Sequence, residues 1–477
     1  MVNLNFKIKM ANMEIGILRK EVESITVEIF RLIRKRFNLV KKIAEAKMRS
    51  GLPVEDVNTE RKLKEIISKE CESSSLNPEF GLRLLNLLIE ESKNVQKGII
   101  EKTVEKAAFS SPYEVFAEAK KMERIGKSII HLEVGEPDFG PPERVKEAVL
   151  NALESGYVRY TETAGIPQLR ERIAAFTNEL FHADISPEQV IVTPGGRYAV
   201  FLAISSILSP GDEAIVFEPA WPAYKDCIKA VQAKAVSIST WLENDWEPDL
   251  NALAKHVTEL TKLVVLNNPN NPTGKIVNDN VLGKIVEMAG ENDIFILSDE
   301  VYSNFAFKPF KSILEFSDCK HIYVNSFSKT FGMTGFRIGY AISDAETIKK
   351  MTKIQNLCIT SVPEFVQYAA ITALECMEEA KEYMKTVRER MNFLCNALNK
   401  INVSYYRPDG GLYVFPRLQA DNVDMQTFVK RLLLEKGVCV TPGTAFGDEY
   451  KNFFRVTACQ PKEQLLEAVK RMEDLLK

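Results

Sequence analysis

Cysteine, histidine and long apolar runs are scarce in this chain, and each scarcity excludes a class of site. Eight cysteines are scattered over 477 residues without a C-x-x-C pair, which argues against a zinc site or a disulfide framework and fits a reducing compartment. The four histidines form no ligand or triad pattern, so no metal site is predicted. No apolar run approaches the ~18 residues of a membrane span and no signal-type segment is present, so we expect a cytoplasmic protein without a membrane partner.

The charge balance gives no reason to expect nucleic acid as a partner, because the formal net charge is only −3. The charge is nevertheless uneven along the chain. Residues 1–100 carry 19 Lys and Arg against 14 Asp and Glu, a balance of +5, so the remaining residues carry −8. A basic module joined to an acidic one favours an anionic ligand for the basic module, although a solvated helix surface would give the same composition.

Apolar residues recur at helical spacing from Met13 to about residue 96, with few Gly or Pro among them. The spacing predicts helices over about 14–49, 57–71 and 78–97, the first ended by a Ser-Gly-Leu-Pro turn. Three helices without a closed core of their own usually pair with a second copy. A homodimer is therefore expected.

The texture of the chain changes from residue 113 onward. Short β-type apolar runs, such as Glu213-Ala-Ile-Val-Phe217, alternate with helical stretches, the pattern of an α/β domain with a large, mainly parallel sheet. From about residue 345, helices with a few short strands predict a smaller α+β subdomain. The predicted boundaries are a tail at 1–12, an all-helical domain at 13–98, a linker at 99–112 and the α/β domain at 113–477.

Polar side chains follow the carboxyl end of nearly every predicted strand, where parallel sheets bind ligands. The Gly195-Gly196 turn opens a helix and offers backbone N–H groups to a phosphate. Asp299 needs a cation or a proton donor, and Lys329 is a candidate imine-forming amine. Together they suit pyridoxal 5′-phosphate, with Asp299 on the pyridine nitrogen and Lys329 joined to the aldehyde. The predicted cofactor-binding residues are Gly195, Gly196, Arg197, Trp221, Asn271, Asp299, Tyr302, Ser326, Ser328, Lys329 and Arg337.

Several of these features have a simpler interpretation when taken alone. A Ser-rich turn with one lysine is more often a solvated loop, a Gly-Gly turn is common between a strand and a helix, and Trp221 could serve packing only. Arg197 is open between a phosphate contact and a second substrate carboxylate, which would favour a dicarboxylic substrate. The bond Asn271–Pro272 is a candidate cis peptide.

Residues 113–477 resemble a class I aminotransferase of fold type I over nearly their whole length. The resemblance implies that Arg455 clamps the substrate α-carboxylate with help from Gly135 and Asn271, and that amino acids and 2-oxo acids are the substrates. It also implies that Tyr160 reaches the cofactor phosphate of the neighbouring subunit in a homodimer. The matching motifs are Leu132-Glu-Val-Gly-Glu-Pro-Asp138, Tyr160-Thr-Glu-Thr-Ala-Gly165, Asn271-Pro-Thr-Gly274, Ser298-Asp-Glu-Val-Tyr302, Ser326-Phe-Ser-Lys329 with Arg337, and Phe454-Arg-Val456.

The N-terminal helices carry a second set of polar residues. Arg36 and Lys47 lie on one helical stripe about 16 Å apart, Arg19 lies about 100° off that stripe, and Ser92 and Gln96 face together. With these residues, Asp56 and Glu60, the pattern resembles the all-helical chorismate mutase family over about residues 14–97.

The mutase resemblance implies an intertwined dimer. Arg19 of one chain and Arg36 of the other would bind the two carboxylates of chorismate. No covalent chemistry is required, because holding the reactive conformer and stabilising charge on the breaking C–O bond suffices. The other implied contacts are the ether oxygen for Lys47 and Gln96, the ring hydroxyl for Glu60 and the Asp56 backbone, and a carboxylate for Ser92.

One position departs from the mutase pattern, since the family usually has an Arg-Glu pair where this chain has Thr59-Glu60. The next residue, Arg61, is turned by about 100° and does not substitute. We expect a bifunctional enzyme of aromatic amino-acid biosynthesis that converts chorismate to prephenate and transaminates prephenate, aromatic keto acids or aspartate. The alternatives are an aspartate-type aminotransferase with a non-catalytic, regulatory or dimerising helical module, and a pyridoxal-phosphate lyase.

Overall fold

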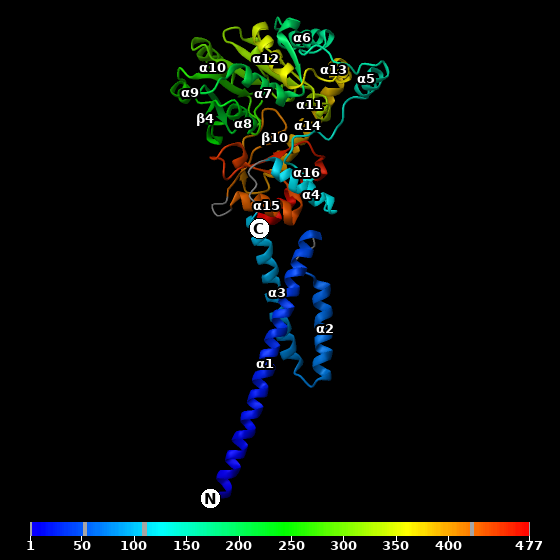
Figure 1. Ribbon diagram of the computed structural model, residues 1–477, viewed down its shortest axis with the longest axis vertical. Helices are drawn as coiled ribbons and strands as arrows, with labels where there is room; N and C mark the ends of the chain where they lie inside the picture. Colours follow the sequence, from blue (N-terminus) through cyan, green and yellow to red (C-terminus); the bar gives the residue numbers. More distant parts are fainter. Residues whose placement is uncertain (1, 51–54, 107–111, 420–423, 477) are drawn as a thin grey trace. The chain divides into compact units, whose positions relative to one another are not determined.

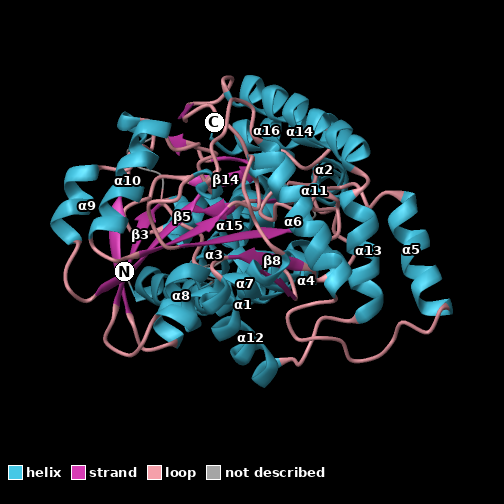
Figure 2. Ribbon diagram, turned by 90° about the horizontal axis from the view of Figure 1, so that it is seen from above, coloured by secondary structure: helices cyan, strands magenta, loops and turns pink. Residues whose placement is uncertain are grey.

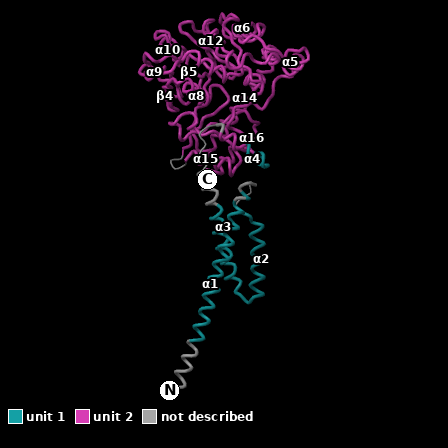
Figure 3. The backbone as a smooth tube through the Cα atoms, in the orientation of Figure 1, with its two compact units in different colours: residues 1–108, 120–128 teal, residues 109–119, 129–477 magenta. Residues whose placement is uncertain are grey.

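The computed structural model divides the chain into two compact units. Unit 1 comprises residues 1–108 and 120–128, and unit 2 comprises residues 109–119 and 129–477 (Figure 3). The structure describes residues 2–50, 55–106, 112–419 and 424–476, without the side chains at 2–12, 45, 48–50, 97–106, 112 and 113.

Unit 1 contains three helices in the predicted order, α1 (Val2–Ser50), α2 (Val57–Ser73) and α3 (Pro78–Lys106) (Figure 1). The side chain of Asp56 caps α2, because its Oδ1 accepts a hydrogen bond from the Thr59 N–H at 3.0 Å. Such a cap satisfies one of the backbone donors that a helix start leaves unpaired.

The helix ends differ from the prediction at both ends of unit 1. The predicted loose tail at 1–12 is wrong, because α1 begins at Val2 and no Gly or Pro interrupts residues 2–12. The chain is helical at both ends of the predicted linker at 99–112. Helix α3 continues to Lys106 and helix α4 (Pro112–Arg124) begins at the last linker residue. Residues 107–111 lie outside the described part.

Much of the apolar surface of α1 is uncovered within the single chain. Leu18, Val22, Ile25 and Leu32 are each more than half exposed, and apolar surface of this extent usually marks an interface. None of the described helices is long and apolar enough to cross a membrane.

Unit 2 is organised around a seven-stranded sheet in the order β2-β8-β7-β6-β5-β3-β4. Strand β8 runs antiparallel to both of its neighbours, and all other adjacent pairs are parallel. Six strands therefore place their carboxyl ends at one edge, where such sheets bind ligands. The strands are β2 (Val190–Thr193), β3 (Glu213–Glu218), β4 (Lys234–Ser239), β5 (Thr261–Asn267), β6 (Phe295–Asp299), β7 (His321–Ser326) and β8 (Gly339–Ile342).

Successive side chains of the central strands enter two different apolar cores, as the period of a strand requires. In β5, Val264 and Leu266 belong to one core and Leu263 and Val265 to the other. Figure 2 shows the three helices of the second core together on one side of the sheet. The second core contains α7 (Gly196–Ile207), α8 (Ala223–Ala230) and α12 (Ala345–Cys358), and the first contains α5 (Glu143–Glu154), α6 (Pro167–Phe181), α9 (Leu250–His256), α10 (Asp279–Glu291) and α13 (Glu364–Leu374).

Short strands and three further helices form the smaller part of unit 2. Strand β14 (Phe454–Thr457) lies between β10 (Tyr413–Val414) and β13 (Thr441–Pro442) in an antiparallel sheet. Strand β1 (Ile130–His131) pairs in parallel with β12 (Val438–Cys439). The remaining elements are β9 (Val403–Ser404), β11 (Arg417–Leu418), α14 (Met377–Leu398), α15 (Met425–Lys436) and α16 (Lys462–Leu476).

Candidate active sites

A pocket of about 240 Å³ opens at the carboxyl ends of the parallel strands of unit 2. It gathers residues that lie far apart in the sequence. The predicted site residues in its lining are Gly135, Gly196, Arg197, Trp221, Asn271, Asp299, Tyr302, Ser326, Ser328, Lys329, Arg337 and Arg455. Lining residues without a predicted role include Glu133, Tyr224, Asn267 and Tyr413.

One side of the pocket is shaped for an anion. Gly195 precedes α7 with φ of +87°, and a Cβ there would lie 2.5 Å from Arg337 Nη2, so the position requires glycine. Gly196 begins α7 and packs against Ser326, because a Cβ on Gly196 would lie 3.3 Å from the Ser326 Cβ. The Ser326 and Ser328 hydroxyls are 2.9 Å apart. Helix N–H groups, two hydroxyls and a guanidinium are the donors that a phosphate prefers.

The carboxyl group of Asp299 is buried at the end of β6, in the lining of the pocket. Tyr224 donates a hydrogen bond from its hydroxyl to Asp299 Oδ2 at 2.7 Å, and the Val301 N–H donates to Oδ1 at 3.3 Å. Burial raises the pKa of Asp299 to about 6, against the lowering effect of these two donors. A buried carboxylate needs a positive partner, and a protonated ring nitrogen would supply one.

The amine of Lys329 reaches the pocket from the short helix α11 (Phe327–Thr330). Its Nζ donates a hydrogen bond to the Gly135 carbonyl oxygen at 2.7 Å. The hydroxyls of Tyr302 and Tyr413 lie 3.2 Å apart in the same pocket. Burial raises the pKa of Tyr302 well above its usual value, so its hydroxyl stays protonated and can donate.

Arg455 of β14 is held on two sides within the pocket. Its Nη1 donates to Asn271 Oδ1 at 2.7 Å and its Nη2 donates to the Glu133 carbonyl oxygen. The guanidinium carbon lies 4.1 Å from the centre of the Tyr413 ring. Its buried Nε has no hydrogen-bond partner among the described residues. A fixed guanidinium of this kind suits a carboxylate ligand.

The predicted cis peptide in the Asn271 loop is wrong. In the described part of the chain the cis bonds are Glu218–Pro219 and Asn268–Pro269, and Asn271–Pro272 is not one of them. The loop contains two Asn-Pro bonds three residues apart, and the sequence does not distinguish them.

Arg197 and Trp221 contact each other at the pocket wall. The Arg197 guanidinium carbon lies 4.7 Å from the centre of the Trp221 ring, an arrangement typical of a cation–π contact. Burial lowers the pKa of Arg197, and the positive charge of Arg337 acts in the same direction. An anion between the two guanidiniums would relieve this repulsion.

Tyr160 does not belong to the pocket of its own chain. Its side chain is 88% exposed and it is absent from the pocket lining. This position is consistent with the expectation that Tyr160 serves the neighbouring subunit, and the single chain does not test it.

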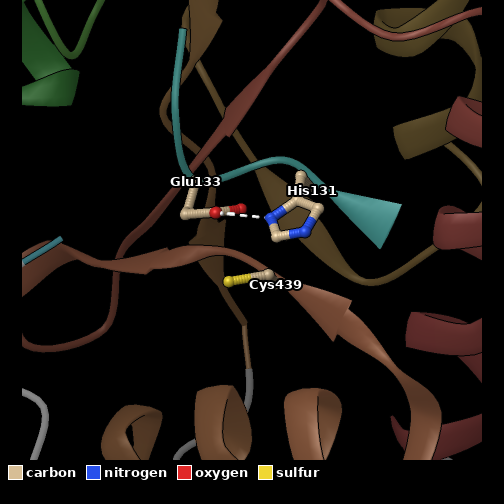
Figure 4. Close-up of side chains that lie close together, drawn as sticks. All are labelled: His131, Glu133 and Cys439. Atoms are coloured by element: carbon tan, nitrogen blue, oxygen red, sulfur yellow. Dashed lines mark hydrogen bonds and ion pairs between the residues drawn. The ribbon is translucent and has the colours of Figure 1, made fainter. Parts of the chain in front are cut away.

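A second polar cluster lies behind Arg455 and was missed in the sequence. His131, Glu133 and Cys439 place one nitrogen, one carboxylate oxygen and one sulfur within 4.8 Å of one another (Figure 4). The His131 Nδ1 and Glu133 Oε1 are hydrogen-bonded at 2.7 Å, whereas the buried Glu133 Oε2 has no hydrogen-bond partner among the described residues. No local sequence pattern indicates this cluster, because the parallel pairing of β1 with β12 brings its residues together.

In unit 1, Arg36 of α1 reaches across to α3. Its Nη1 donates to Ser92 Oγ at 2.5 Å and to the Leu88 carbonyl oxygen at 3.1 Å. Gln96 lies one turn after Ser92 and is buried, with an Oε1 that has no hydrogen-bond partner among the described residues. A buried amide oxygen without a partner is costly and points to a missing ligand or neighbour.

The acidic residues of the predicted mutase site lie on or beside α2. Glu60 Oε1 lies 3.0 Å from the ammonium of Lys93 on α3. A hydrogen bond from the Thr59 N–H lowers the pKa of Asp56, and the positive charge of Lys47 acts in the same direction. The structure therefore brings four predicted side chains together as two pairs. Arg36 lies beside Ser92, and Asp56 lies near Lys47.

Arg19 is the exception among the predicted mutase residues. It lies on the exposed N-terminal part of α1, 17 residues before Arg36. The single chain therefore does not bring Arg19 into the site, as the off-stripe position in the sequence leads one to expect.

Comparison with known families accounts for both units. Residues 127–472 match the family model for aminotransferase class I and II, and residues 18–97 match the model for chorismate mutase type II. The chain belongs to the aminotransferase class I and II family and carries a chorismate mutase domain at its N-terminal end. The predicted fusion and the two enzyme classes, an isomerase and an aminotransferase, are confirmed.

Similar proteins of known activity cover the large unit. The aspartate aminotransferase of Pyrococcus horikoshii is 38% identical over 369 residues, which are 76% of this chain and 93% of that protein. Aromatic-amino-acid aminotransferase 2 of Thermococcus litoralis is 32% identical over 359 residues, 74% of this chain and 92% of that protein.

Solved structures confirm the fold of unit 2. The aspartate aminotransferase of Thermotoga maritima has a TM-score of 0.73 at 37% identity and covers 78% of this chain and 98% of its own. An aromatic aminotransferase of Pyrococcus horikoshii has a TM-score of 0.71 at 31% identity, with 75% and 98% covered. The predicted class, a fold type I transferase with a mainly parallel sheet and a smaller α+β part, is therefore confirmed.

Proposed function

We propose that unit 2 transfers amino groups with pyridoxal 5′-phosphate as its cofactor. The single observation that carries this proposal is the Lys329 amine, which lies in a pocket with an anion cradle and a buried carboxylate. When bound, the cofactor supplies an electron sink for negative charge at the substrate α-carbon. The residues that would hold it are Gly195, Gly196, Ser326, Ser328 and Arg337 at the phosphate, Asp299 at the ring nitrogen, Tyr302 and Asn271 at the ring oxygen, Trp221 at the ring face, and Tyr160 of the second subunit.

The side chains of the pocket divide the chemistry among themselves. Lys329 would hold the cofactor through its amine, and the same amine would move the proton at the substrate α-carbon. Asp299 keeps the ring nitrogen protonated, which the donors Tyr224 and Val301 support by stabilising its charge. Arg455 fixes the substrate α-carboxylate next to Gly135 and so orients the bond to be broken.

A dicarboxylic substrate fits this pocket best. Arg455 and Arg197 are two separate guanidiniums in one lining, and one carboxylate would occupy each. Aspartate, glutamate and prephenate all carry two carboxylates. The names of the relatives agree in part, because both aspartate and aromatic aminotransferases are similar to this chain.

Arg197→Met tests that assignment, with Arg144→Met as the control because Arg144 is exposed and paired with Glu375. Loss of one charged hydrogen bond should lower kcat/KM for dicarboxylic substrates about 10–100-fold and leave phenylalanine little changed. An equal loss for both substrate classes would instead place Arg197 at the cofactor phosphate.

We propose that unit 1 converts chorismate to prephenate in an intertwined homodimer. The proposed roles are Arg36 and the partner's Arg19 on the carboxylates, Ser92 beside Arg36, Lys47 and Gln96 on the ether oxygen, and Glu60 with the Asp56 backbone on the ring hydroxyl. The uncovered apolar face of α1 supports pairing of two chains. The buried oxygen of Gln96, which has no partner within the described part of the chain, supports a ligand in the site.

The two activities together make a bifunctional enzyme of aromatic amino-acid biosynthesis, with the domains at 13–98 and 113–477. One panel on the intact protein tests it. We expect chorismate to be consumed without cofactor, and prephenate to accept an amino group from glutamate or aspartate once pyridoxal phosphate is added. Chorismate binding without turnover would leave a regulatory module, and pyruvate release without an added keto acid would indicate a lyase.

A further inference from the structure

Lys93 of α3 is a cation without an assigned role beside the predicted mutase residues. Its Nζ lies 3.0 Å from Glu60 Oε1 and 3.3 Å from Glu55 Oε1. Its side chain is about a quarter exposed, as is that of Glu60. Lys93 therefore links α3 to α2 at the acidic side chain that is expected to meet the substrate hydroxyl.

The neighbours of Lys93 place it at the same site as the other mutase residues. Ser92, which accepts the hydrogen bond from Arg36, precedes Lys93 and is turned from it by about 100° around the helix. Gln96, whose buried oxygen has no partner in the part of the chain that the structure describes, lies three residues further on, and residues three apart are adjacent on a helix. The Lys93 ammonium, the Glu60 carboxylate and the Gln96 amide, whose oxygen is unpartnered among the described residues, thus lie on α2 and α3.

The predicted mutase site lacks the positive charge of the arginine that the family usually has at position 59. Thr59 replaces the usual arginine, and the Thr59 hydroxyl donates to Asp56 Oδ2 at 2.8 Å, so it completes the helix cap instead of facing a ligand. Arg61 is exposed on α2. Arg36 and Arg19 of the partner subunit are assigned to the two carboxylates, so a cation beside Glu60 would be a third one that strengthens one of these contacts.

We propose that Lys93 is a substrate-binding residue of the mutase site and supplies the positive charge that Thr59 does not. An ammonium has three N–H donors. Glu60 and Glu55 accept two of them, which leaves the third for a substrate carboxylate. Glu60 at the same time is held in place for the ring hydroxyl. This inference rests on the proposed mutase function of unit 1.

The first experiment removes the charge from full-length protein. Lys93→Met keeps most of the side-chain length, Lys93→Arg keeps the charge, and Lys64→Met on the exposed face of α2 is the matched control. We expect KM for chorismate to rise about 10–100-fold in Lys93→Met, corresponding to one charged hydrogen bond. Lys93→Arg should lose less affinity than Lys93→Met because it keeps the charge, and Lys64→Met should stay within about threefold of the original protein.

The second experiment moves the charge to the other helix. In the double variant Lys93→Met/Thr59→Arg, a guanidinium on α2 replaces the ammonium on α3, and we expect it to recover at least tenfold of the lost affinity. If Lys93 only linked α3 to Glu60 on α2, Thr59→Arg would not recover the lost affinity. Residue 59 is itself on α2, so an arginine there does not restore the link from α3 to Glu60. Equal KM values for Lys93→Met and Lys64→Met, or no rescue by Thr59→Arg, would overturn the proposal.

The outcome also separates this inference from the proposed activity. Should the original protein fail to turn over chorismate, the mutase assignment fails, and calorimetric titration with chorismate still tests Lys93. A tenfold or larger loss of binding in Lys93→Met would support the binding role. Unchanged binding, or no binding to the original protein, would overturn it.

Discussion

Tyr224 donates a hydrogen bond from its hydroxyl to Asp299 Oδ2 at 2.7 Å across 75 residues of sequence. Burial raises the pKa of Asp299 to about 6, and the Tyr224 donor is one of the two contacts that oppose this rise. The ability of Asp299 to hold a protonated ring nitrogen therefore depends on the phenol next to it.

Tyr224→Phe should weaken cofactor binding and shift its pH dependence. Without the donor the pKa of Asp299 rises further, so the carboxylate is lost at a higher pH. We expect the affinity of the apoprotein for pyridoxal phosphate to fall about tenfold at pH 7. In the original protein we expect this affinity to fall as the pH drops below the pKa of Asp299, about 6. In the variant the fall should begin at a higher pH. Fluorescence titration across pH measures both, with Tyr383→Phe as the control, and a fall that begins at the same pH in the variant would contradict the coupling.

Glu300 gives the protein a pH-dependent stability of defined sign. Burial raises the pKa of Glu300 to about 8 from 4.5, although the Ile313 N–H and the Ser312 and Ser298 hydroxyls donate to it. Its contribution to folding is therefore fully present below pH 4.5 and is lost as the pH rises through 8. Glu300→Gln stays neutral, so the free energy of unfolding of the original protein should fall relative to the variant between pH 5 and 8. Denaturant unfolding at several pH values measures this, and a constant difference would refute it.

Arg455→Lys should damage substrate binding more than protein folding. A lysine cannot make the paired contact of a guanidinium with a carboxylate, nor keep the bonds to Asn271 and to the Glu133 carbonyl together. We expect KM for amino acids to rise about 100-fold, with the thermal midpoint little changed. Arg417→Lys is the control, since Arg417 is partly exposed and pairs with Glu243. A normal KM in Arg455→Lys would remove Arg455 from the substrate site.

Subunit mixing tests the composite mutase site. Arg19→Ala and Arg36→Ala should each lower mutase activity by at least 100-fold, because a buried substrate carboxylate loses its cation. In a heterodimer of the two variants, one of the two sites regains both arginines. Co-refolded mixtures should therefore recover about a quarter of the original activity, as random pairing makes half of the dimers mixed. No recovery would contradict the shared site.

The strand ends were the part of the catalytic pocket most accessible from the sequence. Asp299, Ser326 and Gly196 each follow an apolar run that could only be a buried strand, and parallel strands bring their carboxyl ends together. The same reasoning placed Lys329 in the pocket, because it lies three residues after Ser326, in the short helix α11. Local pattern and one rule of topology were sufficient for these residues.

Contacts made across the fold were not accessible in this way. Tyr224 and Lys93 carry no motif of their own, and their partners Asp299 and Glu60 lie on other elements. Glu133 stood inside a recognised motif, but its contact with His131 depends on the direction of alternate side chains at the end of β1. The predicted start of the first helix was also wrong. Composition suggested a tail at residues 1–12, but no residue from 2 to 12 breaks a helix.

The central claim is that the Lys329 amine carries pyridoxal 5′-phosphate, and borohydride reduction followed by peptide mass mapping tests it most directly. The purified protein, loaded with the cofactor, should show one reduced pyridoxyl adduct, on Lys329, and lose aminotransferase activity in step with its formation. Lys329→Arg should show neither adduct nor turnover while its thermal unfolding stays close to that of the original protein. An adduct on another lysine, or transamination that survives Lys329→Arg, would contradict the account.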